Sequence, residues 1–561
     1  MRNTLCLLAL CTAAALPARP QDAGQERARP SAQRNTASGD KGVVVSGTAP
    51  ATAAGVRILE QGGNAADAGA ATLLALSATA YTVFCIGGEV PLMVYDAAKK
   101  DVKVLAGQGA APLDPKAIEW YLENGIPNGD VKAAAVPAAL DAIVTLLKMY
   151  GTKTFGEVVQ PTLAILDAGG PTSYREAGRT IETGRNWRGD LAATFRKLAE
   201  AEFAAKGNRE QRLQAVADRF YRGDIAQDLE KWYIEKGGFL RRADLAAHRT
   251  QVEDPVHAAY RGYTVYKVGA WTQGPYLLEA LRLLEGFDLK AMGFLSPDYI
   301  HVVTEAIKLA VADRDEYYAD PNFVKVPLEA LLSDRYMRIR RPLIDMKKAS
   351  LEVRPGDPYN MKPVKQPTSP SDSRRGTTMM CVTDRWGNVI AATPSGLDSI
   401  AGVAGETGIM HGTRLTSLNT RQGTPNVIEP GKRPRVTLSP TLILRDGKPV
   451  VAISVAGGDM QDETAIQLIL DYVDFGMSAE AAYRAPRFAT YHFTSSFGQE
   501  KPKLGSLQLN SRIGNDVAEE LKSRQHTVTT TATANSWPVL IVIDPVTRTA
   551  YAAGSAAGKV E

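Results

Sequence analysis

The junction Gly376-Thr377-Thr378 carries the residues with the clearest potential for chemistry. A threonine hydroxyl inside a chain is a weak nucleophile, because no base is held beside it. If the chain were cut before Thr377, the new α-amine would lie next to the hydroxyl and could act as its base. The ordinary pKa of such an amine is about 7.7–8.0, so a useful fraction is unprotonated near neutral pH. A plain loop that enters a strand is the alternative, and Thr-Thr alone favours that interpretation.

Two further segments carry groups that such a nucleophile would need. Gly457 and Gly458 follow a predicted strand, where successive backbone N–H groups can stabilise a developing oxyanion. The alternative for this glycine pair is a simple turn before the next helix. Thr393 and Ser395 carry hydroxyls that can hydrogen-bond the amine of Thr377 and tune its pKa. Together these residues predict a catalytic set without naming its substrate.

Motifs for other hydrolytic chemistries are absent from the sequence. It contains no G-x-S-x-G, H-E-x-x-H or G-x-x-x-x-G-K-[ST] motif. The six histidines are scattered without metal-ligand spacing, so neither a metal nor another cofactor is expected. Cys85 and Cys381 are the two cysteines beyond the first eighteen residues. They can pair in an oxidising compartment or fill core space, and the sequence leaves both open.

The elements that must position these residues change in character along the chain. Residues 42–352 mix short β-branched runs with longer helical patterns. Residues 353–376 are crowded with Pro, Ser, Asp and Gly, which predicts an exposed, flexible linker. Strands dominate after it, at 377–383, 389–393, 437–445 and 450–455. The pattern predicts one continuous layered α+β body, in which a strand holds Thr377 and the linker lets a cut end move away.

The N-terminal residues predict export of the protein. Residues 1–18 combine a basic start, an apolar run and small residues, as a secretory signal peptide does. Residues 19–41 are polar and predict a disordered leader. No later segment reaches the roughly 18 apolar residues of a membrane span, so a periplasmic or extracellular protein without a membrane anchor is expected. The balance of 65 basic and 61 acidic residues argues against nucleic-acid binding.

Many short segments resemble the γ-glutamyltranspeptidase family in the same order. Individually they are weak, but so many in one order are highly specific, and they extend over nearly all of the chain beyond the leader. The matching segments are 58–71 (ILEQGGNAADAGAA), 86–88, 135–137, 220–226, 313–314, 377–378, 387–388, 430–434, 438–441, 457–458 and 485–487.

This resemblance implies a fold, a maturation step and a set of roles. The fold is an αββα four-layer sandwich of the N-terminal-nucleophile hydrolase type. The precursor cleaves itself between Gly376 and Thr377 into a large-subunit region, 42–376, and a small-subunit region, 377–561, which stay together as a heterodimer in one joint domain. Thr377 is then the nucleophile, the glycine pair supplies oxyanion donors, and small γ-glutamyl compounds such as glutathione are the substrates.

The positions that would bind a free glutamate head depart from the family pattern. An arginine for the α-carboxylate is replaced by Gln108, and the aspartate for the α-amine by Thr416. The other altered substrate positions are Leu397, Val436 and Thr437, and the changes at Glu89 and Met379 lie close to the same motifs. Loss of an arginine–carboxylate pair weakens binding by several kcal/mol.

Three functional hypotheses therefore stay open. The first is a self-processed enzyme that hydrolyses or transfers γ-glutamyl groups. The second keeps the nucleophile and changes the substrate to another amide, as the uncharged residues at Gln108, Leu397 and Val436 suggest. The third is a secreted, non-catalytic binding protein on the same scaffold.

Overall fold

The computed structural model describes residues 35–169, 174–176, 179–181, 186–366, 377–396, 402–497, 501–533 and 536–561. The predicted signal peptide, 1–18, and Gly376 and Leu397 lie outside these ranges. The part from residue 34 onward forms one compact unit. Its centre consists of two seven-stranded sheets that are stacked face to face.

The first sheet runs in the order β1-β20-β19-β15-β14-β9-β8, and all its neighbouring strands are antiparallel. Its strands are β1 (Thr36–Gly39), β20 (Ala550–Ala553), β19 (Trp537–Ile543), β15 (Lys448–Ala456), β14 (Thr441–Arg445), β9 (Tyr263–Lys267) and β8 (Val256–Tyr260).

The second sheet runs in the order β21-β2-β10-β11-β3-β4-β7 and is also antiparallel throughout. Its strands are β21 (Ala556–Lys559), β2 (Gly42–Ser46), β10 (Met380–Asp384), β11 (Val389–Ala392), β3 (Val90–Asp96), β4 (Asp101–Gly107) and β7 (Gln251–Glu253). Strand β10, which follows Thr377, is near the middle of this sheet and is paired on both edges.

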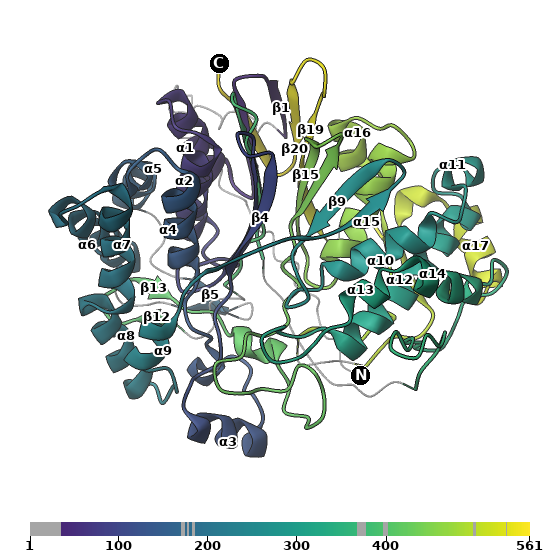
Figure 1. Cartoon of the computed structure of the whole chain (residues 1–561), viewed down its shortest axis with the longest axis horizontal. Helices are drawn as coiled ribbons and strands as arrows, with labels where there is room; N and C mark the ends of the chain where they lie inside the picture. Colours follow the sequence, from purple (N-terminus) through teal and green to yellow (C-terminus); the bar gives the residue numbers. More distant parts are fainter. Residues whose placement is uncertain are drawn as a thin grey trace, which may run out of the picture. The chain divides into compact units, whose positions relative to one another are not determined.

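Helices cover the outer face of each sheet, and Figure 1 shows the resulting layers. The second sheet is covered by α1 (Ala49–Glu60), α2 (Ala65–Thr79) and α4 (Ala139–Tyr150), with α5 (Phe155–Asp167), α6 (Trp187–Ala204) and α7 (Arg209–Tyr221) outside them. The first sheet is covered by α10 (Pro275–Leu284), α12 (Pro297–Tyr317), α15 (Met460–Val473) and α16 (Ala479–Arg484). The predicted αββα sandwich is confirmed.

Smaller elements complete the outer layers. On the side of the second sheet these are α8 (Asp224–Glu235), α9 (Arg242–Ala247), β5 (Tyr174–Glu176), β6 (Arg179–Ile181), β12 (Val403–Ala404) and β13 (Ile409–Met410), and α3 (Pro115–Asn124) lies at the bottom of the view in Figure 1. Beyond the first sheet these are α11 (Leu289–Met292), α13 (Leu328–Leu331), α14 (Asp334–Arg340), β16 (Phe488–Ala489), β17 (Ser506–Asn510), α17 (Asn515–Ser523) and β18 (Thr527–Thr531).

Residue types explain the layers. Helix α2 is rich in alanine and buried on almost every side, because small side chains let it lie between the second sheet and the outer helices. Asn64 caps this helix, as expected from the sequence: its side chain accepts hydrogen bonds from the N–H groups of Ala66 and Asp67, at 2.9 Å and 3.1 Å.

Two sequence-based expectations need correction. The polar leader was expected to extend to residue 41, but 36–39 form β1 at an edge of the first sheet, paired with 550–553. Main-chain hydrogen bonds need no apolar side chains, so composition does not reveal such a strand. The predicted flexible linker also starts too early. Gly356 is buried and held by Asp313, whose carboxylate accepts from the Gly356 N–H at 2.6 Å.

Cys85 and Cys381 do not form a disulfide, and both are buried. Of the two roles that the sequence left open, core filling is therefore the one found. Burial raises the pKa of the Cys381 thiol well above its ordinary value, because the thiolate would lose its hydration. Neither cysteine is exposed as a surface thiol.

Candidate active site

Thr377 lies three residues before β10, and the sheet fixes its position. The adjacent Thr378 donates its backbone N–H to the carbonyl of Pro394 at 2.9 Å, directly beyond β11. Thr378 and Met379 are buried, whereas Thr377 is only half-buried. The threonine is thus held at the end of a central strand while part of its surface is accessible.

Gly457 and Gly458 form the turn between β15 and α15. Their φ angles of 143° and 61° lie in the left-handed region, which residues with a Cβ rarely adopt. This tight turn brings the Gly458 N–H toward the first turn of α15, where Gln461 is located. The sequence left two interpretations of this glycine pair open, a plain turn and a loop that stabilises an oxyanion. Both describe the same backbone turn, so only the groups around the turn can distinguish the two interpretations.

The carboxamide of Gln461 connects these groups. One end lies 3.5 Å from Thr377 Oγ1 and 3.4 Å from Thr437 Oγ1. The other end faces the carbonyl oxygens of Val455 and Thr437, each at 3.0 Å. Two carbonyl oxygens require a donor, so the amide nitrogen belongs at that end. The amide oxygen then points toward the threonine hydroxyls and accepts from the Gly458 N–H at 3.3 Å.

A carbonyl oxygen therefore lies beside the Thr377 hydroxyl and one N–H of the glycine turn. Sequence reasoning did not identify Gln461. The sequence did contain an indication, because Gln461 is a polar residue in the first helical turn after a Gly-Gly pair. Side chains of a helix point toward its N-terminus, and here the N-terminus of the helix adjoins the end of the preceding strand.

Thr393 and Ser395 flank the same strand end. The hydroxyl of Thr393 is 2.9 Å from that of Ser454 on β15, so it links the two sheets. The hydroxyl of Ser395 accepts a 2.6 Å hydrogen bond from Nη2 of Arg414. The backbone groups of Ser395 pair with those of Glu89 in both directions at 2.9 Å. Both residues adjoin Pro394, whose carbonyl accepts from the Thr378 N–H, so they lie next to the strand end that carries Thr377.

Glu89 and Arg414 form a buried ion pair next to Ser395. Arg414 Nε donates to Glu89 Oε1 at 2.7 Å, and both side chains are almost fully buried. Burial raises the pKa of Glu89, although the nearby guanidinium opposes this shift. The sequence singled out Glu89 as unusual for the family but missed its partner. Arg414 is 325 positions away in a mixed polar segment, so the sequence held no local signal for this pair.

A second buried network anchors the glycine turn. Asp459 accepts from Arg314 Nη1 at 2.7 Å and from the Ser496 N–H at 3.1 Å. Burial alone would raise the pKa of Asp459, but Arg314 and Arg435 outweigh it and lower the pKa. Arg435 also donates to the Ser496 hydroxyl at 2.6 Å. Asp459 is therefore ionised, and the turn is tied to α12.

One turn of helix later, Asp462 pairs with Lys267 of β9. Lys267 Nζ donates to Asp462 Oδ1 at 2.6 Å, to the Ser439 carbonyl at 2.7 Å and to Thr441 Oγ1 at 2.9 Å. Both charged side chains are fully buried. The ammonium group thereby uses all three of its protons, and α15 is fixed on the first sheet.

The remaining substrate-binding predictions are scattered. Thr437 lies beside Gln461, whereas Val436 is buried in the core between the sheets. Thr416 donates its hydroxyl to the Thr413 carbonyl at 2.9 Å. Gln108 is buried and lines a separate cavity of about 170 Å³ with Asp320 and Arg433 as well as other residues. None of the other predicted site residues lines that cavity.

Within the described ranges, no group of three or more His, Cys, Asp and Glu side chains could hold a metal ion. Over the same part of the chain, no helix is both long enough and apolar enough to span a bilayer.

The fold and the site define the class of protein. An αββα sandwich, with a threonine at the end of a central strand that faces a glycine turn, is the architecture of the N-terminal-nucleophile hydrolases. A family model for gamma-glutamyltranspeptidase matches residues 51–559. The chain belongs to this family, and it is an enzyme of the hydrolase and transferase class.

Its relatives include two kinds of enzyme. It is 30% identical to the glutathione hydrolase proenzyme of Escherichia coli K12, over 80% of either chain. It is also 30% identical to the acylase ACY 1 proenzyme of Pseudomonas sp. SE83, over 88% of either chain. Among solved structures, LmbA2991HD is similar with a TM-score of 0.84 and 32% identity, over 94% of this chain and 99% of that one.

A second solved structure, cephalosporin acylase from Bacillus halodurans, has a TM-score of 0.80 and 25% identity, over 96% of this chain and 99% of that one. The similarity to each of these two structures therefore extends over nearly the whole of this chain.

Proposed function

We propose that this enzyme is a self-cleaving amide hydrolase and acyltransferase, and that Thr377 is both its cleavage residue and its nucleophile. The observation that carries the proposal is the convergence of Thr377 Oγ1, Thr437 Oγ1 and the Gly458 N–H on one carboxamide oxygen, within 3.3–3.5 Å. An amide carbonyl of a substrate placed at this point would meet the nucleophile and an oxyanion donor at the same time.

The chemistry follows from this placement. After the peptide bond between Gly376 and Thr377 is broken, the new α-amine takes the proton of the threonine hydroxyl as Oγ1 attacks the substrate carbonyl. The Gly458 N–H stabilises the oxyanion. The amine product leaves with the proton, and an ester to Thr377 remains. Water then releases the acyl group as an acid, or another amine accepts it.

Chain cleavage is compatible with an intact fold, because both sheets combine strands from both sides of the cut. Strands β10 and β11 are inserted between β2 and β3, and β9 pairs with β14. We therefore propose that regions 42–376 and 377–561 stay together as a heterodimer after cleavage.

Two kinds of acyl group are candidates. γ-Glutamyl compounds such as glutathione are implied by the family and by the relatives named for that activity. The second candidate is an amide with an uncharged acyl group. The carboxylate of a glutamyl group needs a free cation, but Arg414 is paired with Glu89, and Arg435 lies 3.9 Å from the Asp315 carboxylate and donates to Ser496. Gln108 has no positive charge. The lack of a free cation at these three positions favours an amide with an uncharged acyl group, and the similarity to the acylase ACY 1 proenzyme supports the same candidate.

Export completes the proposal. We propose that residues 1–18 direct secretion and are removed, and that the enzyme acts in the periplasm or outside the cell.

Intact mass and N-terminal sequencing of the purified, exported protein test the proposal first. A fragment of residues 377–561 that begins Thr-Thr-Met-Met is expected, and Thr377→Ala is expected to remain uncut while Thr377→Ser still cleaves, more slowly. A wild-type chain that stays whole would refute the nucleophile and favour the non-catalytic alternative. Turnover of a γ-glutamyl anilide and an acyl anilide then separates the two candidate substrates.

A further inference from the structure

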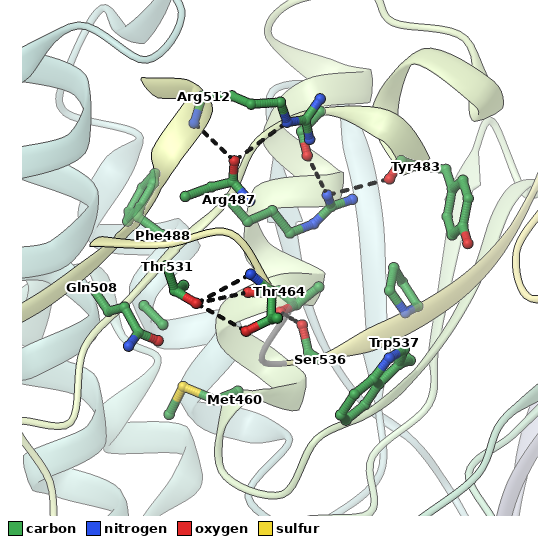
Figure 2. Close-up of a pocket in the computed structure, with 15 residues that line it drawn as sticks. Met460, Thr464, Tyr483, Arg487, Phe488, Gln508, Arg512, Thr531, Ser536 and Trp537 are labelled. Atoms are coloured by element: carbon green, nitrogen blue, oxygen red, sulfur yellow. Dashed lines mark hydrogen bonds between the residues drawn. The ribbon is translucent and has the colours of Figure 1, made fainter. Parts of the chain in front are cut away.

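A cavity of about 170 Å³ lies beside the start of α15 and is lined by fifteen residues (Figure 2). Its volume is more than ten times the roughly 10–15 Å³ that one water molecule needs, so it can hold a small organic molecule. The lining contains neither Asp nor Glu. It does contain two arginines, Arg487 and Arg512, which Figure 2 shows at one end of the cavity.

Backbone carbonyl groups hold both arginines in place. Arg487 donates to the carbonyls of Ala482 and Ala485 at 2.6 Å and 2.8 Å, and Arg512 donates to that of Arg484 at 2.9 Å. These carbonyls belong to the C-terminal end of α16. Among the described residues neither Arg487 nor Arg512 forms an ion pair within 4 Å, whereas the nearby Arg484 and Arg524 pair with Glu480 and Glu520.

The carboxyl group with the most influence on Arg487 is that of Asp471, which does not line the cavity. Burial raises the pKa of Asp471 to about 7, even though Arg487 lowers it. Near neutral pH this group is therefore only partly ionised. The cavity is thus lined by two guanidinium groups, and no carboxylate stands among its lining residues.

The rest of the lining combines aromatic rings and neutral polar groups. Trp537 is 54% exposed and forms part of the rim, and Tyr483 and Phe488 add two further rings. The hydroxyls of Thr464 and Ser536 are 2.6 Å apart on the opposite side. A flat apolar body can stack on the rings while a negative group lies near the arginines.

From this combination we infer that the cavity is a binding site for a small organic carboxylate with an aromatic or similarly flat apolar body. Cationic molecules of the same shape are excluded by the two arginines. The site is separate from the proposed catalytic residues, none of which lines it. It nevertheless adjoins them in the chain, because Met460 lies two residues beyond Gly458 and Trp537 pairs with Ala456 just before the glycine turn.

Calorimetric titration of the full exported protein tests this inference with benzoate as the probe and benzylamine as its cationic counterpart. Benzoate is expected to bind at one site, and benzylamine is expected to bind at least tenfold more weakly. Arg512→Gln should weaken benzoate binding by at least about tenfold, because a charge-assisted hydrogen bond is lost. Arg512 is exposed, so this variant should fold normally.

Arg484→Gln is the matched control. It removes the same charge from the same region, but the Arg484 side chain does not line the cavity and instead pairs with Glu480 at the surface. Benzoate binding should be unchanged in this variant. The inference is overturned if benzoate does not bind, if benzylamine binds equally well, or if the two variants have the same effect. None of these readouts requires an active nucleophile.

Discussion

Replacement of Lys267 by methionine is a direct test of the buried pair that holds α15. The change removes three hydrogen bonds, to Asp462, Ser439 and Thr441, and leaves the Asp462 carboxylate in a site from which solvent is fully excluded. Breaking a buried pair from one side costs about 3–5 kcal/mol of folding free energy. The cost is high because the remaining charge keeps its desolvation penalty and loses its partner.

The pKa shifts of the pair have the direction expected for two charges that have lost their hydration. Burial lowers the pKa of Lys267 and raises the pKa of Asp462 although each partner opposes the shift, so both charges exist at the expense of hydration. The double variant Lys267→Met, Asp462→Leu removes both charges. It should regain most of the lost stability, because packed apolar side chains can replace a buried ion pair at little cost.

Urea unfolding in a Thr377→Ala background measures the effect on a single uncut chain. Lys103→Met is the control, since Lys103 pairs with Asp254 at the surface, where solvent screens the pair and its loss should change stability little. A loss below about 1 kcal/mol for Lys267→Met would refute the reasoning. The same conclusion would follow from a double variant that is no more stable than the single one.

Three further outcomes are expected. Gln461→Ala should lower KM about 2–13-fold with little change in kcat. In the free enzyme the Gly458 N–H then lacks its internal hydrogen bond, worth about 0.5–1.5 kcal/mol, and a substrate no longer has to displace that bond. Gln467→Ala on the same helix is the control, and a large fall in kcat for Gln461→Ala would contradict the prediction. Burial raises the pKa of Asp471 to about 7, so the protonated Asp471 contributes fully to the free energy of unfolding below about pH 4, and this contribution is lost as the pH rises toward 7. Between pH 4 and 7 the free energy of unfolding of Asp471→Asn should therefore change less with pH than that of the wild type. Glu89→Gln should cost several kcal/mol by leaving Arg414 unpaired, and an unchanged melting temperature would count against a buried ion pair.

The layered fold could be predicted well from the sequence, because hydrophobic periodicity and the order of family segments reflect the two sheets and their helices. Thr437 near Thr377, and the glycine turn after β15, also follow from these segments. The sequence could not show β1, whose pairing depends on main-chain groups alone. Whether Thr377 is the nucleophile stays a prediction.

Long-range pairs between charged or polar side chains were the main omission. Glu89 and Arg414 are 325 positions apart, and Lys267 and Asp462 are 195 apart. Nothing local in either segment indicates its partner. For the same reason Gln461 was missed, since its importance depends on which strand end lies opposite the first turn of α15.

The interleaved order of the strands has a consequence for the lifetime of the enzyme. While the chain is whole, β2 and β10 are tethered, and their pairing is an intramolecular event. After a cut before Thr377, refolding of a denatured molecule requires two separate chains to meet, so its yield depends on concentration. Each chain alone also exposes unpaired strand edges, which favour aggregation. If the proposed cleavage occurs, the uncut precursor should therefore refold more readily than the cut form, and the rate of unfolding should set the lifetime of the cut form.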